Sequence, residues 1–386
     1  MPCRMWGAPD TTDFTVDGAS SVSRVEKNPT ADAFAERLFE STLGAFELLS
    51  LYVGDRLGWY RALSANGAMT SAELAARTGT SERYTREWLE FQAVSGILTA
   101  EFGGADSSDA QHRRFHLPSG AAEVLTDETS LAYLGPMARM VAAAAVQLPH
   151  LLDAYRTGAG VSWQQLGTDA RESQADMNRP WYEQRLGAAL REVPDIDEVL
   201  ARPGARVADV GCGAGWSTIA LARAYPGATF EGIDIDEASV EMACHNAEAA
   251  DIADRVSFHI ADGSSVAGAA RYDAAFAFEC VHDMPRPVEV LAAIRKFLKP
   301  DGVLVIMDEA VAEEFTAPGD DLERLMYGFS MFVCLPDGMS SQPSAATGTV
   351  MRPATLRRYA EEAGFSRLEI APIENFGFWR FYVIRP

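Results

Sequence analysis

The stretch "RVADVGCGAGWSTIALARAYPGATFEGIDID" (206–236) decides the fold of this 386-residue chain. Its first residues, "RVADV", are typical of a short buried strand, and "WSTIALARAY" is typical of a helix with one apolar stripe. Gly211, Gly213 and Gly215 separate the two, so a ligand can approach bare backbone at the N-terminus of the helix. The stretch therefore predicts a strand, a glycine turn and a helix that together form a ligand site.

The second strand of this unit, "FEGIDID", places Asp234 19 residues after Gly215. A carboxylate at that position can accept hydrogen bonds from both ribose hydroxyls of an adenine nucleoside. An ordinary tight turn followed by a solvent-facing acid would contain the same glycines. The position of the acid at the end of the next strand favours a nucleoside site over that alternative.

The residues around the turn also indicate which nucleoside is bound. A dinucleotide site needs glycine at the sixth place of its pattern, where this chain has Trp216. Asp209 opens the turn and would repel a pyrophosphate, whereas it would attract a cationic ligand. At this point the chain resembles the class I S-adenosylmethionine-dependent methyltransferases. The matching segments, in order, are "DVGCGAG" (209–215), "GIDID" (232–236), "IADGSS" (260–265) and "FAFECVHDMPRP" (276–287), with "KPDGVLVIMDEA" (299–310) as the fifth strand.

The resemblance implies an α/β fold, namely a doubly wound, Rossmann-like seven-stranded methyltransferase sheet, with S-adenosylmethionine as cofactor. It assigns the methionyl end to Asp209 and the backbone of Gly211 and Gly213, and the ribose to Asp234. It assigns the adenine edge to Asp262 and the Gly263 amide, and the methionine moiety to the backbone at Glu279 and Cys280. The full set of cofactor-binding positions that it implies is Asp209, Gly211, Cys212, Gly213, Gly215, Asp234, Ile235, Asp262, Gly263, Glu279 and Cys280.

His282 is the candidate catalytic residue, because it follows the fourth strand, where open parallel sheets bind ligands. It resembles the general base of plant-type O-methyltransferases, although Met284 replaces the tryptophan of their pattern. Imidazole can take a proton from a phenol or hydroxyl at neutral pH. Two alternatives stay open. His282 could be structural, or it could bind a divalent ion with Glu279, Asp283, Asp308 and Glu309. No distinctive metal-ligand spacing is present, and we predict no metal.

Composition excludes several classes of function. A formal net charge of −22 argues against binding to nucleic acid or to an anionic membrane surface. Five cysteines without a C-x-x-C pair suit a reducing compartment. The first residues lack the basic start and apolar core of a secretory signal. We expect a cytoplasmic enzyme with a small-molecule acceptor.

We expect four regions along the chain. Residues 1–30 are predicted to be a disordered tail. Residues 31–135 are predicted to form a helical, winged-helix domain that begins with an amphipathic helix broken near Gly54. Residues 136–194 are a helical connector that roofs the substrate pocket in the resembling family. Residues 195–386 are the cofactor-binding domain, with a lid insertion at 311–353.

The winged-helix region invites a DNA-binding interpretation, which its charge disfavours. Its second helix carries Arg83 and Arg86 but also Glu82, Glu87 and Glu90, whereas DNA-reading helices are normally basic. We therefore expect a homodimerisation domain. The predicted function is O-methylation of a small molecule in specialised metabolism. The alternatives are C- or N-methylation, possibly metal-assisted, a cofactor-bound rearrangement without methyl transfer, and a ligand-responsive transcriptional regulator.

Overall fold

The computed structural model describes residues 30–101, 112–266 and 268–386. These residues form two compact units that meet in sequence at Ala121 and Ala122. The predicted tail at 1–30 lies outside the described residues except for Thr30, and so does nearly all of the predicted wing loop at 102–112. The predicted domain bounds remain predictions.

The first unit has the predicted helical and winged-helix elements. Its helices are α1 (Ala31–Arg56), α2 (Trp59–Asn66), α3 (Ser71–Thr78) and α4 (Glu82–Val94), and α5 (Ser119–Thr126) spans the change of unit. Thr70 caps α3 in a reciprocal capping box with Glu73, and Gly79 ends that helix in the left-handed conformation. The strands β1 (Thr99–Glu101) and β2 (Arg114–His116) pair antiparallel, as predicted.

The predicted break of the first helix near Gly54 occurs at Leu57 and Gly58, three to four residues later. Helix α1 continues to Arg56, and the chain turns at Gly58, which has φ +70°. Gly54 is needed for packing, because a Cβ there would lie 2.3 Å from the Trp88 ring. Gly54 is therefore explained by the close contact between the helix and the Trp88 ring.

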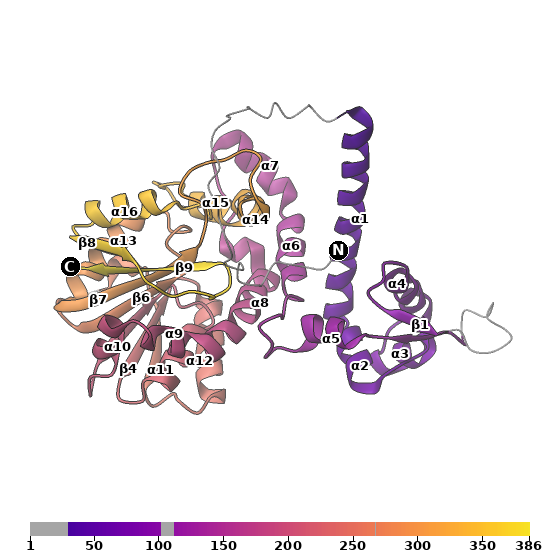
Figure 1. The fold of residues 1–386 in the computed structure, drawn as a ribbon, viewed down its shortest axis with the longest axis horizontal. Coiled ribbons are helices and arrows are strands. Elements are labelled where there is room, and N and C mark those ends of the chain that lie inside the picture. Colours follow the sequence, from indigo (N-terminus) through magenta and orange to yellow (C-terminus); the bar gives the residue numbers. More distant parts are fainter. Residues whose placement is uncertain (1–29, 102–111, 267) are drawn as a thin grey trace, which may run out of the picture. The chain divides into compact units, whose positions relative to one another are not determined.

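The second unit begins with helices and a sheet follows (Figure 1). The helical part comprises α6 (Met137–Val146), α7 (Leu148–Thr157), α8 (Trp163–Trp181), a π-helical turn at Tyr182–Leu186, α9 (Gly187–Arg191) and α10 (Pro194–Leu200). Residues 158–162 separate α7 from α8.

The sheet has seven strands in the order β5-β4-β3-β6-β7-β9-β8. Strands β3 to β7 are parallel, and β9 runs antiparallel between β7 and β8. The strands are β3 (Arg206–Val210), β4 (Thr229–Asp234), β5 (Val256–Ile260), β6 (Tyr272–Phe278), β7 (Leu298–Glu309), β8 (Arg367–Ile370) and β9 (Trp379–Arg385). The helices between them are α11 (Trp216–Ala224), α12 (Glu237–Ala249), α13 (Pro287–Phe297) and α16 (Pro353–Glu362). This is the predicted doubly wound architecture.

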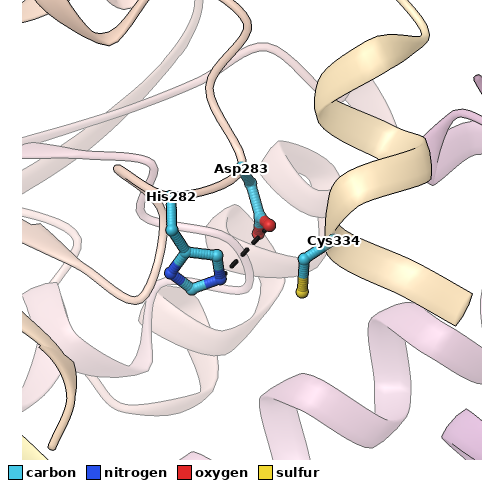
Figure 2. Close-up of side chains that lie close together, drawn as sticks. All are labelled: His282, Asp283 and Cys334. Carbon is cyan, nitrogen blue, oxygen red and sulfur yellow. Dashed lines mark ion pairs between the residues drawn. The ribbon is translucent and has the colours of Figure 1, made fainter. Parts of the chain in front are cut away.

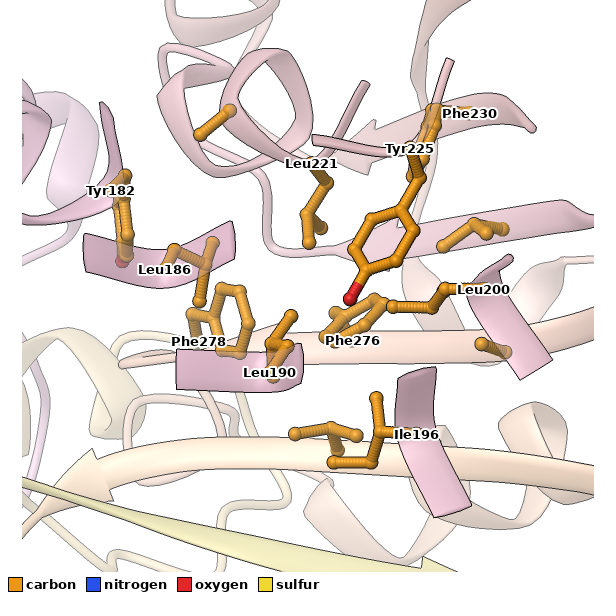
Figure 3. Close-up of a cluster of buried hydrophobic side chains, with 14 of the residues drawn as sticks. Tyr182, Leu186, Leu190, Ile196, Leu200, Leu221, Tyr225, Phe230, Phe276 and Phe278 are labelled. Atoms are coloured by element: carbon orange, nitrogen blue, oxygen red, sulfur yellow. The ribbon is translucent and has the colours of Figure 1, made fainter. Parts of the chain in front are cut away.

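Side chains that alternate along the central strands build a core on each face of the sheet. Phe276 and Phe278 of β6 belong to the first core, with Leu190 and Ile196 from the preceding helices (Figure 3). Ala275 and Ala277 of the same strand belong to the second core, with side chains from α13 and α16. β6 is buried along its whole length, and a strand that is buried on both faces of a sheet has a nearly continuous apolar sequence.

The predicted lid insertion is largely helical. It contains α14 (Asp321–Phe329), a π-helical turn at Ser330–Cys334 and α15 (Leu335–Met339). The Val161 amide donates to the Pro336 carbonyl, and the Trp163 amide donates to Asp337, so this segment packs against the start of α8. Among the helices within the described ranges, none combines the length and the apolarity that crossing a membrane requires.

Candidate functional site

The order of the sheet reverses between β3 and β6, and the chain crosses to opposite faces on either side of that point. Open parallel sheets bind ligands outside the carboxyl ends of the strands at such a reversal. The predicted residues gather there, because each lies at the carboxyl end of β3, β4, β5 or β6 or in the loop that follows it. Gly211 has φ +74°, and a Cβ on it would lie 2.7 Å from Cys280 Sγ, so only glycine lets these two loops approach.

Gly213 and Asp234 form the centre of the glycine loop. The Gly213 amide donates a 2.8 Å hydrogen bond to Asp234 Oδ2, and the Asp236 amide donates to Oδ1 at 2.9 Å. Burial raises the pKa of Asp234. Gly213 has φ +50°, and a Cβ on it would meet no heavy atom of the described residues within 4 Å. The structure thus leaves space over the backbone of Gly213 beside a carboxylate.

Asp209 is buried at the end of β3, with 1% of its surface exposed. Its Oδ2 accepts hydrogen bonds from the hydroxyls of Ser217 and Thr218, each at 2.6 Å. Its Oδ1 has no hydrogen-bond partner among the described residues. Burial raises the pKa of Asp209 to about 6, because the two hydroxyl hydrogen bonds only partly offset the loss of solvation. A buried carboxylate oxygen without a donor is suited to a cationic or hydrogen-bond-donating ligand.

Asp262 follows β5 and is held by a partner that the sequence analysis did not anticipate. The Ser264 amide and hydroxyl donate to its Oδ1, and Arg286 donates to its Oδ2 at 3.1 Å. Burial alone would raise the pKa of Asp262, but these hydrogen bonds and the Arg286 charge lower it. Asp262 is therefore an anion fixed beside the loop after β6.

Glu279 follows β6 in the left-handed region, with φ 48°, which is uncommon for a residue with a side chain. Its carboxylate accepts from the side-chain amides of Asn178 and, at 3.4 Å, Gln174, both on α8. Burial raises the pKa of Glu279 to about 7. The connector helix therefore supplies side chains to the site. A second link is the bidentate pair of Arg171 with Asp236, at 2.6 and 2.8 Å.

His282 is 2% exposed and is surrounded by carboxylates. Nδ1 lies 2.8 Å from Asp308 Oδ1 and 3.3 Å from Glu309 Oε2, and Nε2 lies 3.2 Å from Asp283 Oδ1. Burial by itself lowers the pKa of His282, but the charges of Asp283, Asp308 and Glu309 outweigh burial and raise it well above its ordinary value. Carboxylates on both edges of the ring favour the protonated imidazole, which is a poorer proton acceptor, and the base role of His282 stays a prediction.

The lid insertion contributes a residue that the sequence analysis did not place in the site. Cys334, at the end of the π-helical turn, lies beside His282 and Asp283 (Figure 2). Burial raises the pKa of the Cys334 thiol. No local pattern could have shown this approach, since 51 positions of chain separate the cysteine from Asp283.

Comparison with known proteins identifies two regions of the chain. Residues 201–347 match the family described as a methyltransferase domain, and residues 45–127 match the Rv2258c-like winged HTH domain. Over 125 residues the chain is 34% identical to the 27-O-demethylrifamycin SV methyltransferase of Amycolatopsis mediterranei. That match covers 32% of this chain and 46% of the relative, so the chain spans about half the length of this curated relative.

Solved structures share the fold over nearly the whole chain. The human N-acetylserotonin methyltransferase, solved in complex with SAM, is 18% identical, with a TM-score of 0.68 over 93% of this chain and 99% of that one. The mitomycin 7-O-methyltransferase is 22% identical, with a TM-score of 0.68 over 92% and 98% of the two chains. At these identities the likeness establishes the architecture.

Proposed function

Because the chain combines a class I S-adenosylmethionine-dependent methyltransferase domain with an N-terminal winged-helix domain, we propose that it transfers a methyl group to an oxygen atom of a small molecule. The match to a rifamycin-pathway methyltransferase and the fold shared with a mitomycin O-methyltransferase support an acceptor from specialised metabolism. We propose that the enzyme is cytoplasmic.

The observation that carries the proposal is the pairing of an unpartnered Asp209 oxygen with open space over Gly213 at the reversal of the sheet. S-adenosylmethionine supplies an electrophilic methyl group on a sulfonium, together with an ammonium that a buried carboxylate can bind. Asp209 and the loop Gly211–Gly215 would hold the methionyl end. Asp234 would accept the ribose hydroxyls beside Ile235, which is 72% exposed and can pack on an apolar ring face. Asp262, Gly263 and the backbone at Glu279 and Cys280 complete the predicted set.

Methyl transfer is a displacement in line with the leaving group, so the chain's main task is to align the acceptor. The contacts of α8 and of the lid segment with the loops after β4 and β6 support this role. Asn178 contacts Glu279, Arg171 contacts Asp236, and Cys334 lies beside Asp283. We propose that the connector and lid helices form the walls of the acceptor pocket.

We propose that the first unit mediates homodimerisation and does not bind DNA. Helix α1 exposes a long set of apolar side chains, far more than a monomeric helix normally shows to water. They are Phe34, Leu38, Phe39, Leu43, Phe46, Leu49 and Val53. On α4, Arg83 pairs with Glu87 and Arg86 with Glu82, so acids already offset the arginines that would contact phosphates.

Two measurements test the enzymatic proposal. S-adenosylhomocysteine should raise the melting temperature of the purified protein in a concentration-dependent manner, while NAD should not. Incubation with methyl-labelled S-adenosylmethionine and an extract of the source organism should then give a product with one added methyl, whose mass spectrum locates it on oxygen. Stabilisation by NAD alone would contradict the cofactor assignment. Methylation at carbon or nitrogen would contradict the choice of oxygen.

A further inference from the structure

One edge of the His282 ring faces two groups that commonly bind metals. Asp283 Oδ1 lies 3.2 Å from Nε2, and the ligand atoms of His282, Asp283 and Cys334 all lie within 4.8 Å of one another. In Figure 2 the histidine and the aspartate come from the loop after β6, and the cysteine approaches from the helical lid segment. An imidazole, a carboxyl group and a thiol thus converge from two parts of the chain.

The other edge of the ring fixes its orientation. Asp308, which is 1% exposed, lies 2.8 Å from Nδ1. If Nδ1 donates its proton to Asp308, the lone pair of the neutral ring is at Nε2 and faces Asp283 and Cys334. Metal-binding histidines almost always donate the other ring N–H to a carboxylate, a backbone carbonyl or a water, which sets the tautomer and the ring angle.

The cluster has fewer hydrogen-bond donors than its carboxyl oxygens can accept, and its only cationic group is the His282 imidazole. Three carboxylates surround one imidazole in the interior, and an uncompensated buried charge is costly. Asp283 Oδ1, Asp308 Oδ2 and Glu309 Oε2 are buried atoms without a hydrogen-bond partner in the described parts of the chain. Asp308 and Glu309 are more than nine-tenths buried. A divalent cation would compensate this negative charge.

We propose that His282 Nε2, the Asp283 carboxylate and Cys334 Sγ bind one divalent transition-metal ion of the Zn²⁺ or Fe²⁺ type. This donor set selects such ions over Mg²⁺ and Ca²⁺, which prefer oxygen ligands alone. Ligand atoms around one Zn²⁺ lie about 3–4 Å apart, and the atoms of this set, all within 4.8 Å of one another, are close to that spacing. Binding releases the thiol proton and the second imidazole proton to solvent.

A second donor set, His282 with Asp308 and Glu309, is a poorer site. It would use Nδ1, which Asp308 already engages, and all three residues are fully buried. Asp283 is partly exposed as a residue, so the set with Asp283 and Cys334 is the less enclosed of the two. Three protein ligands leave a coordination position open, as in catalytic sites.

The role of the ion rests on the proposed function, whereas its binding does not. An acceptor hydroxyl that coordinates a divalent ion loses its proton more readily. Ion binding would therefore activate the acceptor without a free imidazole base, which explains why His282 can be enclosed by carboxylates. It would also link the lid segment to the loop after β6 when the ion is bound.

Cobalt substitution tests the site directly. The full chain is stripped with a chelator and titrated with Co²⁺, and the absorption spectrum is recorded. We expect one Co²⁺ per chain, with an intense near-ultraviolet band from thiolate-to-cobalt charge transfer. Cys334→Ser should abolish that band, and Asp283→Asn should weaken Co²⁺ binding at least tenfold. Cys244→Ser is the matched control, because this cysteine is exposed on α12 and should leave the spectrum unchanged.

Absence of the band from the wild type, or its persistence in Cys334→Ser, would overturn the proposal. Stabilisation by S-adenosylhomocysteine is measured on the same samples and reports folding of each variant. If the cofactor still stabilises the protein but no thiolate–cobalt band appears, only the metal site is refuted. If the band appears without cofactor stabilisation, the proposed methyltransferase function fails and the metal site stands.

Discussion

Substituting Gly213 by alanine separates ligand binding from folding at the centre of the cofactor site. A Cβ at this position meets no described atom within 4 Å, so the cofactor-free fold can accommodate it. The cost to folding is the strain of placing alanine at φ +50°, about 1–2 kcal/mol. The substitution should also lower the affinity for the ligand, because the new methyl group occupies the space in which the ligand approaches the backbone.

Gly204→Ala supplies the matched control. Gly204 has φ +74°, its added Cβ also meets nothing within 4 Å, and it lies before β3, away from the carboxyl ends of the strands. Both variants should therefore lose about 1–2 kcal/mol of unfolding free energy in denaturant titrations without cofactor. Only Gly213→Ala should lose affinity for S-adenosylhomocysteine.

The magnitude follows from linkage. At a ligand concentration of 100 times the wild-type Kd, binding stabilises the native state by about 2.7 kcal/mol. Displacing the ligand far enough to lose one hydrogen bond raises Kd about tenfold and reduces this gain to about 1.4 kcal/mol. Thermal unfolding with and without ligand gives both quantities. Equal ligand stabilisation of the Gly213→Ala and Gly204→Ala variants would refute the assignment of the space over Gly213.

Three further predictions follow from the same contacts. The pKa of Asp209 is raised to about 6, so between about pH 4 and 6 the folded state holds a proton that the unfolded state has lost. The free energy of unfolding therefore falls as pH rises through that window, and Asp209→Asn should remove about 3 kcal/mol of this fall in pH-dependent denaturation. The same variant should weaken S-adenosylhomocysteine binding. Arg171→Ala should destabilise the fold by about 3–5 kcal/mol, since it strands the 5%-exposed Asp236 without a counter-charge, and a change below 1 kcal/mol would contradict a structural role for the pair. Light scattering should give about twice the 41.8 kDa chain mass, and Phe39→Asp on the apolar face of α1 should halve it, whereas Tyr84→Asp on α4 should not.

The sheet could be predicted because its signals are local. The apolar run "RVADV" predicted β3 at its observed bounds, and β6 ends shortly before His282, as expected for the fourth strand. The capping box at Thr70 is likewise a four-residue signal. The break could be placed only to within a few residues, because a glycine that interrupts a helix and a glycine that packs under a tryptophan ring, such as Gly54, look the same in sequence.

The partners of the site residues could not be predicted in this way. Arg286 pairs with Asp262, Asn178 with Glu279 and Cys334 with His282 across gaps of 24 to 101 residues, and no periodicity encodes such distances. The environment of His282 was predicted in part, because the metal-binding alternative already grouped Asp308 and Glu309 with it. The sequence did not show that both carboxyl groups lie at Nδ1, a contact that arises because β6 and β7 are neighbours in the sheet.

The carboxyl edge of the sheet carries buried acidic side chains. Burial raises the pKa of Asp209 to about 6 and that of Glu279 to about 7, which means that the fold holds carboxylates where their charge is unfavourable. Selection for stability alone would replace them with neutral side chains, since a buried carboxylate without a cation costs free energy. A cationic ligand recovers that cost on binding. The sulfonium and ammonium groups of the cofactor would do so beside Asp209, and a divalent ion would do so beside His282. The buried acidic groups thus lower the stability of the cofactor-free enzyme. They also favour binding of the two cations that the proposed chemistry uses, which are the cofactor and the divalent ion.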